Sequence, residues 1–283
     1  MKRLTGLSRN ADITREDFAE MKNAGIDCIE VSPKAEQYDT ILDFDRLKAL
    51  ADEFDITLRS FHQRFSVEYD ISSTDENIRT SAVAYYEKFI SDAARVGIKI
   101  HVVHASSEPI EDEDRAAHIA SAKKSLAELA EYAAQYDSVI AVEDLPRSCL
   151  GNCSADMLEL TSADDRLMIC FDTNHLLSEN IADFIRATAH KYITVHFSDY
   201  DFINERHWLP GEGDINWCEL MDTLDEMGYE GPVLYELGFV APTTIVRPRD
   251  LNAYDFKRNH IELEGRLELT KIGERKPNLG MWG

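Results

Sequence analysis

The chain has 283 residues, close to the roughly 250 that are typical of one closed α/β barrel, so a single domain is expected. Its 53 acidic and 30 basic residues give a formal net charge of -23, a field that repels polyanions and argues against nucleic acid as a partner. Hydrophobic residues make up 44% of the chain, which supplies a large core and excludes a disordered protein.

Cysteine usage and hydropathy predict a protein of the cytoplasm. The five cysteines include no C-x-x-C pair, so neither a disulfide framework nor a cysteine zinc site is indicated. The first ten residues, MKRLTGLSRN, lack the apolar region of a secretory signal, and no run approaches the roughly 20 apolar residues that span a bilayer. We therefore expect a cytoplasmic protein with no membrane partner. The oligomeric state stays open, with a homo-oligomer among the options.

Short apolar runs rich in Val, Ile and Leu recur along the chain and predict buried strands. They are nearly continuous rather than alternating, which is typical of strands covered on both faces in a parallel sheet. In chain order they are Leu4–Ser8, Cys28–Pro33, Ile56–His62, Ile98–Ala105, Val139–Pro146, Leu167–His175, Tyr192–Asp199 and Pro232–Gly238.

Amphipathic stretches between these runs predict helices, most clearly Glu76–Gly97, Asp114–Gln135 and Asn216–Gly228. Two of them end on a glycine suited to a helix C-terminus. Strand, helix, strand, repeated about eight times, is the pattern of a (β/α)8 TIM barrel in the α/β class. A doubly wound open sheet is the alternative, but no G-x-G-x-x-G turn follows any of the first three strands. We expect one TIM-barrel domain over residues 1–283, with 247–283 as a C-terminal helix and extension.

Nearly every predicted strand ends on an ionisable residue that follows apolar ones. The C-terminal ends of barrel strands surround one mouth, so these side chains converge there. Such a cluster would repel itself unless a cation or shared protons neutralised it, and a metal ion is the simplest explanation. A single histidine of this kind would more often be a hydrogen-bonded core or substrate-contact residue, and Glu30 could simply cap a helix. The residues are Glu30, His62, His104, Glu143, Asp172, His175, His196 and Glu236.

A glycine-containing segment, RHWLPGEGDINW at residues 206–217, follows the seventh run and predicts a tight loop. Its first two residues, Arg206 and His207, could reach over the mouth to bind substrate oxygens or a second metal ion. Its glycines also fit an ordinary turn that leads into a helix capped by Asn216. The two interpretations are compatible. Trp208 could form a wall of the pocket.

Four motifs at these strand ends resemble one known superfamily. They are AVEDLP, CFDTNH, TVHFSD with RHWLPGEGDINW, and VLYELG. Together they look like the xylose isomerase-like barrels, which include sugar isomerases, sugar epimerases and endonuclease IV, and the resemblance covers about residues 26–238. In the epimerase and inosose-isomerase branch, two glutamates, an aspartate and a histidine hold one Mn, Zn, Co or Mg ion. The resemblance implies Glu143, Asp172, His196 and Glu236 as these ligands.

The endonuclease IV branch of this superfamily uses nine ligands for three zinc ions, and the resemblance extends to it. Glu205 stands at the ninth position, where that branch has aspartate, and the motifs SFHQRF and VVHASS also differ. No Lys/Arg-rich DNA-binding loops appear. A polynuclear site with up to three Zn ions therefore stays open. The eight matching positions are His62, His104, Glu143, Asp172, His175, His196, His207 and Glu236.

These features predict a divalent-metal-dependent isomerase or epimerase whose small substrate is a sugar, a sugar phosphate or an inositol-derived ketose. We expect Glu143 and Glu236 to transfer protons through a metal-stabilised enediolate. The alternatives are an endonuclease IV-like zinc phosphodiesterase acting on abasic DNA and a non-catalytic sugar-binding barrel. The candidates for substrate binding or additional metal ions are His62, His104, His175, Glu205, Arg206 and His207.

Overall fold

The computed structural model describes residues 3–277 and 279–280, and within them eight parallel strands form a closed barrel in the order β1 to β8. The barrel closes where β8 pairs with β1, with Gly6 opposite Leu234. Every strand overlaps one of the apolar runs, so the predicted TIM barrel is confirmed. The strands are β1 Thr5–Arg9, β2 Cys28–Val31, β3 Thr57–His62, β4 Ile100–His104, β5 Val139–Glu143, β6 Met168–Asp172, β7 Tyr192–Phe197 and β8 Val233–Tyr235.

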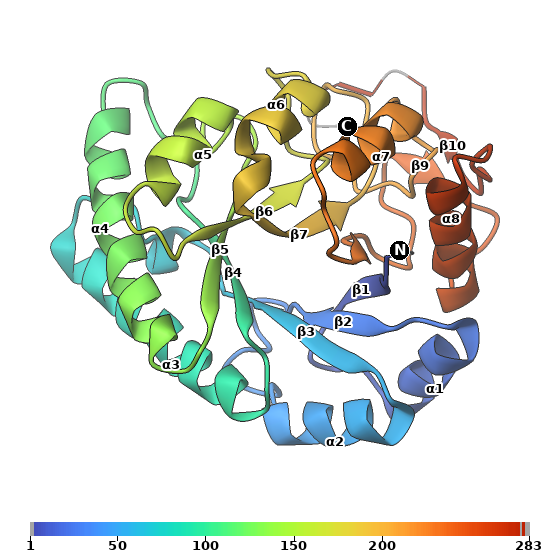
Figure 1. Ribbon diagram of the computed structural model, residues 1–283, viewed down its shortest axis with the longest axis horizontal. Coiled ribbons are helices and arrows are strands. Elements are labelled where there is room, and N and C mark those ends of the chain that lie inside the picture. The colour runs from blue at the N-terminus through green and yellow to red at the C-terminus, as the bar shows by residue number, and fades with distance from the viewer. Residues whose placement is uncertain (1–2, 278, 281–283) are drawn as a thin grey trace.

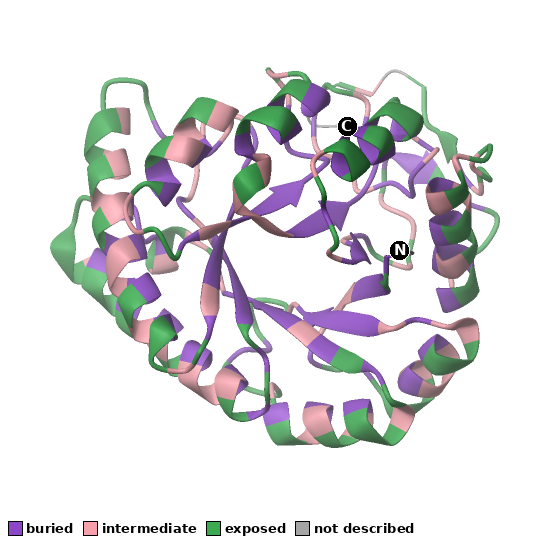
Figure 2. Cartoon of the chain, viewed as in Figure 1, coloured by how far each residue is buried: buried purple, intermediate pink, exposed green. Residues whose placement is uncertain are grey.

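An α-helix follows each barrel strand in the described part of the chain, and the helices surround the barrel (Figure 1). Their inner faces are buried against the strands, while their outer faces are exposed (Figure 2). Two short 3-10 helices, η1 Val67–Tyr69 and η2 Ala189–Lys191, precede α3 and β7. The helices are α1 Arg15–Ala24, α2 Phe44–Phe54, α3 Glu76–Arg95, α4 Arg115–Ala134, α5 Ser154–Thr161, α6 Ile181–Thr188, α7 Trp217–Glu226 and α8 Ala253–Gly265.

The glycines predicted at the ends of two helices, and the asparagine predicted at the start of one, terminate these helices as expected. Gly97 and Gly228 follow α3 and α7 with φ of +92° and +73°, a left-handed conformation that glycine adopts without a steric penalty. The side chain of Asn216 accepts a hydrogen bond from the Glu219 amide and caps α7. Beyond residue 247 the chain forms α8 and then the short strand β10, Glu274–Arg275, which pairs antiparallel with β9, Ile245–Val246.

Apolar side chains fill the lower part of the barrel interior and leave its mouth to polar ones. Ile100, Val102, Ala141 and Cys170 form a buried cluster of their own. Side chains alternate along a strand, so the next inward residue on β4 is His104, and the next on β5 and β6 are Glu143 and Asp172. The floor of the candidate site is therefore a packed apolar layer. No helix of the described residues is long and apolar enough to cross a membrane.

Candidate metal centre and active site

The C-terminal strand ends bring four potential ligands into one group. Strand register places Asp172 directly beside His196, and Glu143 lies on the neighbouring strand. One ligand atom from each of Glu143, Asp172, His196 and Glu236 lies within 4.8 Å of the other three. The side chains of the first three are fully buried, whereas that of Glu236 is 20% exposed. The four residues that the family resemblance implied are thus neighbours in space.

Two further groups with metal-ligand chemistry flank this one. His62 and His104 approach the same oxygen of Glu143, with Nε2 to Oε2 distances of 3.0 and 3.1 Å. On the other side, ligand atoms of His175, Glu205 and His207 lie within 4.8 Å of one another. All nine positions from the endonuclease IV comparison therefore lie around one mouth. Glu143 belongs to both the central group and the His62 group.

Hydrogen bonds orient three of the flanking histidines so that one ring nitrogen of each can bind a cation. The Nδ1 atoms of His62, His175 and His207 lie 2.9, 2.7 and 3.1 Å from backbone carbonyl oxygens, those of the residue after His62, of Asp144 and of Glu236. A carbonyl oxygen can only accept, so each Nδ1 must donate. In the neutral ring this leaves Nε2 without a proton, which is the arrangement that metal-binding histidines adopt.

His196 is oriented in the opposite sense by a buried carboxylate. Its Nε2 lies 3.1 Å from Oε1 of Glu30, and its Nδ1 lies 2.9 Å from Glu236 and 3.0 Å from Glu143. Glu30 is fully buried in β2 and accepts a 2.7 Å hydrogen bond from the Ser60 hydroxyl. The suggestion that Glu30 caps a helix is wrong, because its side chain points into the barrel and supports His196.

The central group has a surplus of negative charge that a cation would neutralise. Burial raises the pKa of Asp172 well above its usual value, and the carboxylates of Glu236 and Glu143 raise it further. Oδ2 of Asp172 is buried and has no hydrogen-bond partner. Burial would also raise the pKa values of Glu143 and Glu236, but the charges and hydrogen bonds of the neighbouring histidines, His196 first among them, together lower both pKa values. A buried oxygen without a hydrogen bond, among four oxygen and nitrogen ligands, fits a divalent ion.

The flanking groups contain histidines that bind protons readily when no metal is present. Burial would lower the pKa of His62, but the hydrogen bond to Glu143 and that carboxylate's charge raise it to about 9. Burial would lower the pKa of His207 as well, and its contact with Glu205 raises it to about 9. Glu205 already has a cationic partner, since its Oε1 lies 2.6 Å from Nη1 of Arg147.

Two adjoining cavities open at the mouth. The first, of about 440 Å³, contains all of the flanking histidines together with both glutamates of the central group. The second, of about 790 Å³, extends toward the loops after β1, β2 and β3. Phe65, His207 and Glu236 line both cavities, so the two spaces meet beside the central group. Phe65 stacks on His104, with ring centres 4.0 Å apart, and supplies an apolar wall.

The loop after β7 brings His207 to the mouth but directs its neighbours elsewhere. Arg206 is buried, its Nε donates to Asp201 at 2.9 Å, and its Nη2 donates to the Gly280 carbonyl at 2.7 Å. It lines neither cavity, so His207 and not Arg206 is the loop residue at the site. Trp208 is fully buried, and its indole donates to Thr244 at 2.9 Å. The expectation that Trp208 could wall the pocket is wrong.

Asp199, at the end of the seventh apolar run, holds this loop in place. Its carboxylate accepts hydrogen bonds from the backbone amides of Gly211 and Ile215 and from the indole of Trp217, at 2.7, 3.2 and 2.8 Å. A Cβ on Gly213 would lie 2.0 Å from the same carboxylate, so only glycine fits there. The glycines therefore serve the turn that the sequence indicated, and Asp199 is the residue around which the turn folds.

A comparison with known protein families identifies the family of this barrel. Residues 18–247 match the family described as the Xylose isomerase-like TIM barrel. The chain belongs to this family. The superfamily that the motifs resembled is thereby confirmed.

Relatives of this xylose isomerase-like barrel include sugar isomerases and epimerases. The D-psicose 3-epimerase of Ruminiclostridium cellulolyticum is 26% identical over 265 residues, which cover 87% of each chain. The inosose isomerase of Halalkalibacterium halodurans is 31% identical over 125 residues, 40% of this chain and 44% of that one. A crystal structure of a D-tagatose 3-epimerase-like protein has a TM-score of 0.79 at 23% identity, covering 94% of this chain and 98% of that one. The D-tagatose 3-epimerase-like protein therefore has the same fold as this chain.

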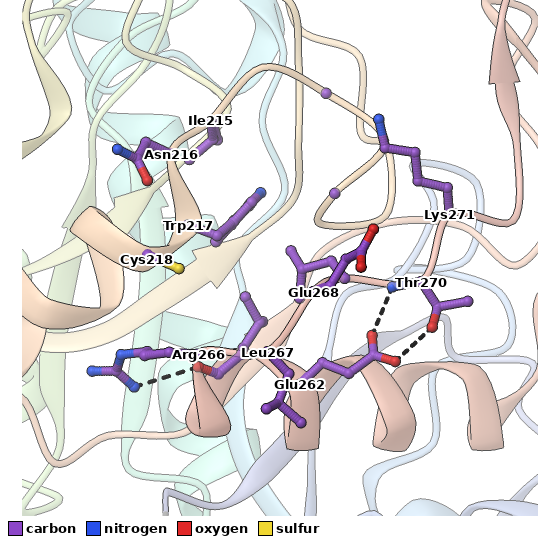
Figure 3. A pocket seen from close by; sticks show the side chains of 14 residues that line it. Ile215, Asn216, Trp217, Cys218, Glu262, Arg266, Leu267, Glu268, Thr270 and Lys271 are labelled. Carbon is purple, nitrogen blue, oxygen red and sulfur yellow. Dashed lines mark hydrogen bonds between the residues drawn. The ribbon is translucent and has the colours of Figure 1, made fainter.

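A separate hollow of about 680 Å³ lies outside the barrel of this xylose isomerase-like chain. It is formed by the start of α7, the end of α8 and the segment that follows α8 (Figure 3). In it Glu262 accepts two hydrogen bonds from Thr270, one from the backbone amide and one from the hydroxyl. Its lining residues include none of the nine candidate ligands, so the chemistry is expected at the mouth.

Proposed function

We propose that this chain is a divalent-metal-dependent sugar isomerase or epimerase. The observation that carries the proposal is the central group of Glu143, Asp172, His196 and Glu236, in which a buried carboxylate orients the histidine and one aspartate oxygen has no hydrogen-bond partner among the described residues. The curated relatives, a D-psicose 3-epimerase and an inosose isomerase, support the choice of substrate and reaction class.

The four residues of the central group would hold the ion. Lewis-acid polarisation of a substrate carbonyl and its neighbouring hydroxyl is the chemistry that a bound divalent ion supplies. Oxygen and imidazole ligands suit Mn, Zn, Co and Mg to different degrees, and the ligand set does not select one of them. The proton transfers fall to the protein's own carboxylates.

Glu143 and Glu236 are the residues that we assign to proton transfer. The charge of His196 lowers the pKa of both, so both are ionised at neutral pH and can act as bases. Glu236 lines both cavities and is the more exposed, whereas both oxygens of Glu143 contact histidines. One carboxylate would remove the proton beside the carbonyl. Delivery of a proton by the other carboxylate to the opposite face of the same carbon would give epimerisation, and delivery to the adjacent carbonyl carbon would give isomerisation.

His175 and His207 are assigned to binding substrate hydroxyls. Both line the cavity of about 440 Å³, and their rings lie 6.4 Å apart and nearly perpendicular. Because each Nδ1 is engaged by a backbone carbonyl, Nε2 faces the hydroxyl, accepting from it in the neutral ring and donating to it in the protonated ring. These contacts would orient a sugar over the central group.

A polynuclear zinc phosphodiesterase is the second candidate function. It is favoured by the two flanking groups, His62 with His104 and His175 with His207, which repeat metal-ligand chemistry around the same mouth. Against a third ion stands the ion pair between Glu205 and Arg147, because a guanidinium next to a ligand repels a cation. The net charge of -23 also disfavours duplex DNA.

Four measurements on one preparation separate these functions. Elemental analysis gives the number of ions per chain, and one ion is expected. Incubation with a panel of free and phosphorylated ketoses in D2O should place deuterium at the carbon beside the carbonyl, detected by proton NMR. Cleavage of an abasic duplex by a protein with three zinc ions would establish the phosphodiesterase instead. Sugar binding with neither reaction would leave a non-catalytic barrel.

A further inference from the structure

The cavity of about 790 Å³ beside the mouth is rich in cations, in contrast to the rest of this acidic chain. Arg9, Lys34 and Arg64 line it, coming from the ends of β1, β2 and β3. Among the described residues that line it, the only carboxylate is that of Glu236, which the proposed function assigns to the metal ion. A chain with 53 acidic and 30 basic residues thus places three cations and one committed carboxylate in a single cavity.

Arg9 has unused binding capacity. Its guanidinium stacks over Phe239, 4.3 Å from the ring centre, and Phe239 also lines the cavity. Its Nε is buried and has no hydrogen-bond partner, and no ion pair links its guanidinium to any carboxylate of residues 3–277. Asp12, Asp17 and Glu20 act on it only through longer-range charge. A half-buried guanidinium without an anion is costly, because its charge has lost water without gaining a partner.

Arg64 and Lys34 complete the cationic lining. Arg64 stacks over Tyr69 at 4.5 Å and donates one hydrogen bond to the exposed Asp39 at 3.2 Å. Its Nε is buried without a hydrogen-bond partner among the described residues, and its guanidinium also contacts Tyr85. Lys34 is exposed, and its ammonium has no ion-pair partner in the described part of the chain.

We propose that this cavity binds an anionic group, a phosphate or a carboxylate, on the substrate whose reacting carbons lie at the central group. The inference rests on the proposed function and narrows its substrate class to sugar phosphates or sugar acids. Arginine suits this task because its planar donors match the oxygens of either anion. Glu236 and His207 line both cavities, so one extended molecule would span them.

Two variants and one control test the proposal through binding, independently of turnover. Arg9→Gln and Arg64→Gln each remove one cation from the cavity. Arg95→Gln removes an exposed arginine at the end of α3, where its partner is Asp45 and not the cavity. The ligands are D-ribulose, D-ribulose 5-phosphate and D-fructuronate, titrated calorimetrically into metal-loaded protein. Thermal unfolding of each variant establishes that it is folded.

One of the two charged sugars should bind the wild type and Arg95→Gln about 10-fold to 100-fold more tightly than D-ribulose. Arg9→Gln and Arg64→Gln should remove most of this preference, and the better anion identifies the source as phosphate or carboxylate. Equal affinity for neutral and charged sugars would overturn the proposal, as would an unchanged preference in both variants. Lys34→Gln, at an exposed position, repeats the test if Arg9→Gln does not fold.

Failure of the proposed function has a different signature. A protein that prefers the charged sugar but exchanges no deuterium into any ketose would retain the anion subsite and lose the isomerase assignment. Exchange of deuterium into free ketoses, without any preference for binding the charged sugars, would retain the isomerase assignment and overturn the anion subsite.

Discussion

Nε2 of His196 lies 3.1 Å from Glu30, and this contact turns the opposite ring nitrogen toward Glu143 and Glu236. A carboxylate behind a ligating histidine fixes its tautomer and raises its basicity. Glu30→Gln keeps the shape of the side chain and removes the charge. We expect this variant to bind Mn or Zn about 10-fold to 100-fold more weakly, the usual effect of losing such a partner.

Isothermal titration with Mn chloride gives the affinity directly. Glu36→Gln is the matched control, since Glu36 is exposed in the loop after the same strand. Wild-type metal affinity in Glu30→Gln would show that His196 needs no support from β2.

The two glutamates assigned to proton transfer should be separable from their role in holding metal. Glu143→Gln and Glu236→Gln retain an oxygen ligand but lose the base. We expect each to retain some metal and to cut turnover about 100-fold or more, the scale of losing a general base. Elemental analysis and initial rates on the same sample test this. Near-normal turnover in both variants would remove the two glutamates from the mechanism.

His101 makes the stability of the protein depend on pH. It is fully buried in β4, and both of its ring nitrogens lack a hydrogen-bond partner. Burial, with a smaller contribution from Lys99, lowers its pKa to about 3, whereas an unfolded histidine has a pKa near 6.5. Between pH ~6.5 and 3, His101 therefore binds a proton in the unfolded chain but not in the folded chain. Stability from this residue is fully present above pH ~6.5 and is lost as pH falls from ~6.5 toward 3.

Urea unfolding at two pH values measures this contribution. Between pH 7.5 and 5.0 the wild type should lose about 2 kcal/mol more unfolding free energy than His101→Phe, which cannot titrate. His190→Phe, at an exposed position, should keep the pH dependence of the wild type. Parallel pH profiles for the wild type and His101→Phe would contradict the prediction.

A buried ion pair supports the loop that carries His207. Arg247 and Glu212 are both fully buried, with Nη2 to Oε2 at 2.7 Å, and Glu212 also accepts hydrogen bonds from the amides of Leu209 and Gly273. Glu212→Gln leaves the guanidinium without an anion and should lower the unfolding free energy by about 3 to 5 kcal/mol.

The exposed pair of Arg15 and Glu53 supplies the control for this experiment. Glu53→Gln should change the unfolding free energy by less than about 1 kcal/mol, because water screens the pair. Denaturant curves for the two single variants compare the pairs directly. A similarly small loss of unfolding free energy in Glu212→Gln would mean that burial does not increase the contribution of the ion pair to stability.

The sequence predicted the barrel well because its signals are local. Each strand is one apolar run, and each ionisable strand end follows from the alternation of side chains. The central group could be anticipated because the C-terminal ends of parallel barrel strands always meet. The prediction of Glu143, Asp172 and His196 as ligands needed only this rule and the family resemblance.

Contacts between distant segments could not be predicted in the same way. The role of Glu30 depends on which residue of β7 lies across the barrel from it, and the choice between Arg206 and His207 depends on the path of a loop. Arg9 is the last residue of β1 and Arg64 lies in the loop after β3, and no local sequence pattern links the two. Only closure of the barrel places them in one cavity.

The final segment has a consequence for the shape of the mouth. The Gly273 amide donates to Glu212 and the Gly280 carbonyl accepts from Arg206, so both contacts hold the loop that carries His207. All eight barrel strands precede these two glycines in the chain and pair with one another without them. We infer that the barrel sets the positions of the central group, whereas the segment after α8 sets how His207 faces that group.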